Sequence, residues 1–161
     1  MRELYIKQKV FKITDHYPVM DQYGDLVYQV DQDFKLIGNK VRVSNAEGVE
    51  IFVVDKEILT FLPRYQISFA NGQHVTIKSR FTLFAKQIDV ESEGLNLFLQ
   101  GSFFDYDFEV YQGDRVIGSI SKRFMTFGDT YELKIYDESL EVYVLALMIA
   151  VDCIKDSQEK N

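Results

Sequence analysis

Two short basic motifs contain the residues of this sequence that could bind an anion. Lys78 and Arg80 flank Ser79, and side chains two residues apart on a β-strand point to the same face of the sheet. A lysine and an arginine on one face can bind a phosphate group, because the guanidinium offers paired donors. Lys122 and Arg123 form a second basic pair. We therefore name Lys78, Arg80, Lys122 and Arg123 as candidate phosphate-binding residues.

An ordinary surface role is the alternative for the same residues. Lys9, Lys56 and Lys122 each open an apolar stretch, as Lys78 does. Lysines at strand starts keep sheet edges soluble and face water. A repeated lysine of this kind would need no ligand, so both interpretations of the basic pairs stay open.

The other reactive residue types show no catalytic or metal-binding pattern. His16 and His74 lie far apart in the sequence, and neither has an evident serine or cysteine nucleophile. Cys153 lies in an apolar segment without an activating neighbour. Acidic residues come in pairs, which is too few for a calcium loop: Asp31 with Asp33, and Asp105 with Asp107. We therefore expect no catalytic residues, no metal, no cofactor and no enzyme activity.

Composition indicates a globular protein that does not bind nucleic acid. Hydrophobic residues make up 47% of the 161 residues and aromatic residues 14%. The net charge of −7, from 18 basic and 25 acidic side chains, opposes general affinity for a polyanion. The single cysteine and the lack of an apolar signal-peptide segment near the N-terminus predict a cytoplasmic location, either in solution or at the periphery of a membrane.

Glycines at regular intervals indicate a repeated β-hairpin. They stand at Gly24, Gly48, Gly72, Gly94 and Gly113, with spacings of 24, 24, 22 and 19 residues. Residues 65–69 and 131–135 alternate apolar and polar side chains, which is typical of a strand with one buried face. We also expect strands in four segments that begin with lysine: 9–13, 56–61, 78–84 and 122–127. Six hairpins give about twelve antiparallel strands.

One segment has a different pattern and predicts a buried helix. From Val142 to Val151 the chain has ten residues without a charge or a turn-forming residue. This segment is shorter than the ~20 residues that a transmembrane helix needs, and a helix that is apolar all round must be buried all round. We predict one mainly β domain, 1–161: a closed barrel (1–136), a central helix (138–154) and a polar tail (155–161). We expect the Asp152 side chain to emerge at the barrel mouth. The alternative is that its carboxylate caps the backbone amides of a neighbouring strand.

The chain combines the repeated hairpins with the segment ISKRFMTFGDTYELKIYDES (120–139) and the apolar helix LEVYVLALMIAVDCI (140–154). In these features it resembles the LURP-one-related proteins. This family shares a superfamily with Tubby C-terminal domains and phospholipid scramblases. The resemblance extends over almost the whole chain and implies a twelve-stranded barrel threaded by a C-terminal helix. Tubby proteins bind phosphoinositides through a Lys-x-Arg pair on a strand, which Lys78 and Arg80 match.

These observations lead to one expected function and one alternative. The resemblance implies a non-catalytic binding module that recognises phospholipid headgroups or a membrane surface through the four basic residues. The alternative is a protein-interaction scaffold that uses its acidic loops and has no lipid role. Nothing in the sequence identifies the ligand, the protein partner or the oligomeric state.

Overall fold

The computed structural model describes residues 1–7, 16–34, 39–81, 86–125 and 128–159. This part of the chain forms one antiparallel sheet of twelve strands and one long helix. The strands are β1 (Arg2–Lys7), β2 (His16–Asp21), β3 (Leu26–Phe34), β4 (Asn39–Asn45), β5 (Glu50–Lys56), β6 (Arg64–Phe69), β7 (His74–Phe81), β8 (Lys86–Ser92), β9 (Leu97–Ser102), β10 (Asp107–Gln112), β11 (Arg115–Met125) and β12 (Gly128–Ile135). Two short 3₁₀ turns, η1 (Phe103–Asp105) and η2 (Glu138–Leu140), precede β10 and the helix α2 (Glu141–Glu159).

The sheet curls into a nearly closed barrel. Strands that follow one another in sequence lie side by side, and β1 pairs with β12, with Arg2 opposite Ile135. The sheet order ends at β8 and β9, which are joined by a turn but share no ladder of hydrogen bonds in the described residues. The predicted twelve-stranded antiparallel barrel around a C-terminal helix is therefore confirmed, with one seam between β8 and β9.

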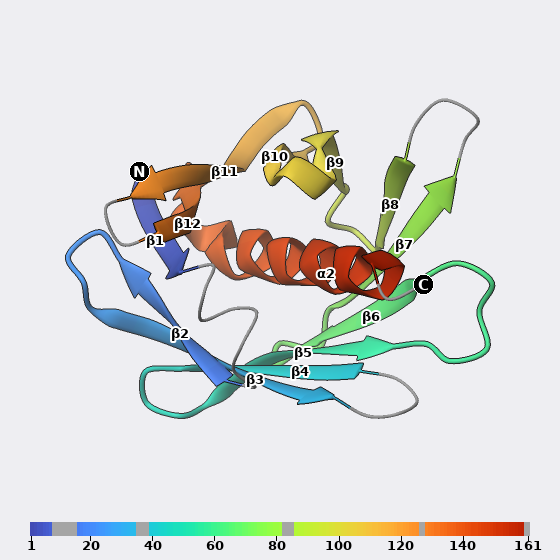
Figure 1. Ribbon diagram of the computed structural model, residues 1–161, viewed down its shortest axis with the longest axis horizontal. Coiled ribbons are helices and arrows are strands. Elements are labelled where there is room, and N and C mark those ends of the chain that lie inside the picture. The colour runs from blue at the N-terminus through green and yellow to red at the C-terminus, as the bar shows by residue number, and fades with distance from the viewer. Residues whose placement is uncertain (8–15, 35–38, 82–85, 126–127, 160–161) are drawn as a thin grey trace.

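Helix α2 fills the barrel. Figure 1 shows it crossing the middle of the molecule, with strands above and below it. Each side chain from Val144 to Val151 is at most 1% exposed, because strands pack against every side of the helix. The fit is tight: a Cβ atom on Gly118 of β11 would lie 2.7 Å from a methyl carbon of Val144. In the described residues no helix is both long enough and apolar enough to cross a membrane.

Polar contacts fix the first turn of α2 and extend its last turns. At the start, Glu141 accepts a hydrogen bond from the Tyr28 hydroxyl at 2.6 Å and pairs with Arg2 at 2.8 Å. The helix continues past the predicted end at Ile154 as far as Glu159. The added turns are held inside the barrel, since the Ser157 hydroxyl lies 2.6 Å from that of Tyr65 and accepts from Lys56 at 3.3 Å. The prediction of a polar tail was therefore wrong for residues 155–159, and residues 160–161 lie outside the described part of the chain.

Asp152 does not lie at the barrel mouth. Its side chain is 2% exposed and accepts a hydrogen bond from the Tyr106 hydroxyl. A buried carboxylate needs such donors, because burying an ion without a partner costs far more than the ~2–7 kcal/mol that an unpaired neutral polar group costs. The preferred interpretation of Asp152 as a mouth residue was wrong.

The predicted turns are confirmed, but one predicted strand is wrong. Gly24, Gly48, Gly72, Gly94 and Gly113 all have positive φ and lie between β2–β3, β4–β5, β6–β7, β8–β9 and β10–β11 respectively. Residues 57–61, which were expected to be in a strand, belong to the loop between β5 and β6. The segments beginning at Lys78 and Lys122 are strands as far as Phe81 and Met125, and the rest of each, like 9–13, lies outside the described residues.

Candidate functional site

The candidate site is a row of charged side chains on the outer face of β6, β7 and β8. Lys78 and Arg80 lie on this face, whereas Ser79 between them is 3% exposed and points to the interior. The prediction that the two basic side chains share a face is thus confirmed. A third basic residue joins them, because the register of β6 and β7 places Arg64 directly opposite Lys78. We call Arg64, Lys78 and Arg80 the basic row.

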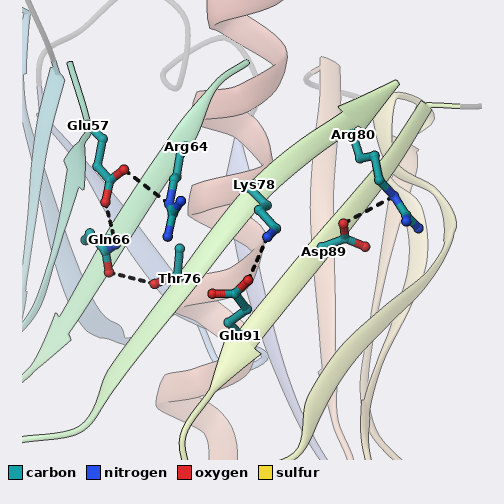
Figure 2. A network of polar contacts seen from close by, with 8 residues as sticks. All are labelled: Glu57, Arg64, Gln66, Thr76, Lys78, Arg80, Asp89 and Glu91. Atoms are coloured by element: carbon teal, nitrogen blue, oxygen red, sulfur yellow. Dashed lines mark hydrogen bonds and ion pairs between the residues drawn. The ribbon is translucent and has the colours of Figure 1, made fainter. Parts of the chain in front are cut away.

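Each member of the basic row has a carboxylate partner, as Figure 2 shows. The Lys78 ammonium donates to Glu91 on β8 at 2.6 Å. That hydrogen bond is the main reason why the pKa of the Glu91 carboxyl is lowered. The other ion pairs are longer: Arg64 with Glu57 at 3.1 Å and Arg80 with Asp89 at 3.3 Å.

All three ion pairs lie at the surface and are accessible to solvent. Side-chain exposure ranges from 32% at Glu57 to 57% at Arg80. Exposed pairs of this kind contribute little to stability, about 0–1 kcal/mol each. The arrangement can therefore exchange its carboxylate partners for another anion without unfolding the sheet. A dianionic phosphate, which accepts bidentate hydrogen bonds from arginine, is the anion best suited to such an exchange.

The second predicted basic pair does not form a common site. Lys122 and Arg123 are consecutive on β11, so they belong to opposite faces of the strand. In the sheet order β11 lies beyond the β8–β9 seam from β7, so the pair is not next to the basic row. Arg123 instead contacts Glu132 of β12, which is 1% exposed, with its Nε 2.7 Å from Oε2. Lys134 lies 3.7 Å from the other oxygen of the same carboxylate.

This environment predicts a structural role for Arg123. Arg123→Ala removes the closest cation from a buried carboxylate and should lower the free energy of unfolding by about 1–3 kcal/mol. Chemical denaturation of the two proteins measures the difference. Adding Glu132→Gln should recover part of the loss, because a neutral amide is cheaper to bury than an unpaired charge. A stability unchanged by Arg123→Ala would contradict this role.

Two further features bear on ligands. A groove of about 450 Å³ follows the seam between β8 and β9 and is lined in part by Gln87 and Asp89, both partners of Arg80. These two lining residues place the groove beside the basic row. In the part of the chain that the structure describes, no group of three or more histidine, cysteine or acidic side chains could hold a metal ion.

Comparison with known proteins identifies the family. The model of the LURP-one-related family matches residues 2–152. The chain belongs to the LURP-one-related family. It is also similar to the Bacillus subtilis protein YxjI, with 28% identity over 159 residues that cover 99% of this chain and 97% of that protein. An X-ray structure of an Arabidopsis thaliana protein has the same fold, with a TM-score of 0.61 and 13% identity over 94% of this chain and 91% of that one.

Membership of the LURP-one-related family agrees with the barrel and its central helix, but it does not assign the site. Sequence reasoning found Lys78 and Arg80 and missed Arg64, together with all three carboxylate partners. The signal for Arg64 was present, because Arg64 directly precedes the alternating segment 65–69. Only the register of β6 against β7 shows that it faces Lys78.

Proposed function

We propose that this LURP-one-related protein is a non-catalytic module that binds the phosphate groups of anionic phospholipids at a membrane surface. The observation that carries the proposal is the basic row, in which Arg64, Lys78 and Arg80 project from adjacent strands onto one exposed face. The sheet fixes the backbone positions of the three residues, so binding requires only the ordering of their side chains.

The interior of the barrel supports binding at the outer surface over catalysis within it. Enzyme sites are commonly concave pockets of about 300–1,000 Å³ that enclose the substrate. Here α2 occupies the volume where a barrel would enclose a ligand, and its side chains pack against the strands. A ligand of the basic row would remain in contact with solvent, as a lipid headgroup does at a bilayer surface.

The proposal predicts that Lys78→Ala/Arg80→Ala weakens binding to anionic vesicles. Each basic residue close to an anionic surface contributes about 1 kcal/mol, so the double variant should bind about 30-fold more weakly. Flotation with vesicles of graded phosphatidylserine and phosphoinositide content, at low and moderate salt, measures the change. Binding by the unmodified protein should weaken as salt rises.

A matched control separates this site from total charge. Arg42→Ala/Arg115→Ala removes the same charge and also breaks two ion pairs at the surface, one with Glu50 and one with the partly buried Asp137. This control should bind vesicles like the unmodified protein. Inorganic phosphate or a soluble inositol phosphate added as competitor shows whether the free headgroup is sufficient or the bilayer is required. Equal loss in both double variants, or no binding to any vesicle, would overturn the proposal and favour the protein-scaffold alternative.

A further inference from the structure

The loop between β5 and β6, residues 57–63, exposes large apolar side chains. Leu59 and Phe61 are fully exposed, and Ile58 is 56% exposed. These side chains do not pack in the hydrophobic core, so their burial does not stabilise the fold. Leu59 also has a φ of 64°, a left-handed conformation that a leucine rarely adopts and that costs about 1–2 kcal/mol. A segment that combines exposed apolar residues with backbone strain does not contribute to folding stability and points to an interaction surface.

The loop lies at the end of the barrel where α2 ends, as Figure 1 shows. Its two anchor residues hold it there: the Lys56 ammonium donates to Ser157, and the Tyr65 hydroxyl donates to the carbonyl of Cys153 at 3.1 Å. Connections in an antiparallel barrel alternate between its two ends. The five glycine turns therefore lie at the opposite end.

Charges next to the loop differ from those at the opposite end. Lys56 and Arg64 flank the loop on either side, and Arg64 pairs with Glu57 at the start of the loop. Strand β7 runs toward the loop from His74, so that Arg80 is nearer this end than Lys78 (Figure 2). The turns at the opposite end carry exposed acidic residues: Asp25, Glu47, Glu93 and Asp114. An apolar tip with cations around its base is complementary to an anionic bilayer, whose surface is negative and whose interior is apolar.

We infer that the loop inserts Leu59 and Phe61 into the boundary between headgroups and acyl chains of an anionic phospholipid bilayer. This inference rests on the proposed function and assigns the orientation of the bound molecule. The end of the barrel with the loop faces the membrane, the basic row lies at the level of the headgroup phosphates, and the acidic turns point away.

The absence of tryptophan from the sequence allows a direct test. Phe61→Trp places a single fluorescent probe at the tip of the loop, and Tyr23→Trp places the matched probe at an 82% exposed position in the β2–β3 turn. With phosphatidylserine vesicles, emission from the Phe61→Trp protein should shift to the blue and be quenched by brominated acyl chains. Emission from the Tyr23→Trp protein should not change.

Polar replacement of the tip gives an independent measurement. Leu59→Ser/Phe61→Ser should reduce the vesicle partition coefficient at least about tenfold, since each apolar side chain that leaves water contributes strongly to partitioning. Its melting temperature should equal that of the unmodified protein, because neither side chain is buried. Reduced binding with unchanged stability supports insertion.

The possible results separate this inference from the proposed function. Flotation without a blue shift at position 61 overturns insertion and leaves headgroup binding in place. A blue shift that persists in the Lys78→Ala/Arg80→Ala background supports insertion and removes the role of the basic row. No flotation and no shift with any vesicle overturns both. A blue shift that appears with rising protein concentration, without lipid, overturns insertion and shows that a second copy covers the loop.

Discussion

Leu145→Asp is expected to yield a chain that does not fold. Leu145 is 0% exposed at the centre of α2, with the barrel closed around it. A carboxylate there would be unpaired, and burying an unpaired charge costs more than the ~5–15 kcal/mol by which a typical domain is stable. Far-ultraviolet circular dichroism and thermal melting of the purified protein measure the outcome. A wild-type spectrum with a cooperative melt would contradict a core built on this helix.

Two control variants define what the aspartate does. Leu145→Ala should fold and lose about 2–5 kcal/mol, which is the cost of a cavity without a buried charge. Val49→Asp introduces the same charge in the β4–β5 turn, where the side chain is 58% exposed, and should melt like the unmodified protein. If all three variants lost their fold alike, general fragility and not the barrel centre would be the cause.

The protein is expected to lose stability steeply above about pH 10. Burial is the first cause that raises the pKa of Tyr17, Tyr65 and Tyr106 above the usual value, and the Asp152 carboxylate adds to it at Tyr17 and Tyr106. In the unfolded chain these tyrosines ionise near pH 10. The folded state then retains protons that the unfolded state releases, so stability is complete below pH 10 and falls as pH rises. Burial likewise raises the pKa of the Cys153 thiol.

The size of this loss makes it measurable. Each of the three tyrosines contributes about 1.4 kcal/mol per pH unit, or about 4 kcal/mol per unit together, and the raised pKa values of Tyr28 and Cys153 add to this slope. Unfolding is therefore expected between about pH 11 and 13. Denaturant midpoints at stepped pH measure the slope. Tyr65→Phe should reduce the slope by about 1.4 kcal/mol per pH unit, whereas Tyr23→Phe, at an exposed position, should leave it unchanged. A folded protein in which all tyrosines ionise near pH 10 would contradict the expectation.

The barrel was predictable because its signals are local. A glycine with positive φ marks each of the five turns, and the alternation of apolar and polar residues shows which side chains of a strand face the interior. The apolar segment of α2 is too short to span a membrane, so the barrel interior is the place where it can be buried. The end of α2 was not predictable in this way. Lys155 and Ser157 look like residues of a frayed tail, and only their contacts with Tyr106 and Tyr65 from distant strands show otherwise.

The loop at 57–63 was misread for a related reason. Ile58, Leu59 and Phe61 have the apolar character of a strand, and sequence patterns assume that apolar residues are buried. Pro63 just before β6 was the available warning, because proline cannot donate a ladder hydrogen bond. A sequence cannot show that apolar residues project into solvent, which is why the surface next to the basic row became visible only in the structure.

The order of elements also determines when the fold can form during translation. The ribosome makes every strand of the barrel before α2, the element that fills it, and β12, the partner of β1, is the last strand to appear. Until α2 has been synthesised, the nascent barrel has no filling and its apolar inner face stays open to water or to a chaperone. A ribosome stalled before residue 141 should therefore carry a chain whose exposed part, outside the ribosome, is sensitive to protease throughout.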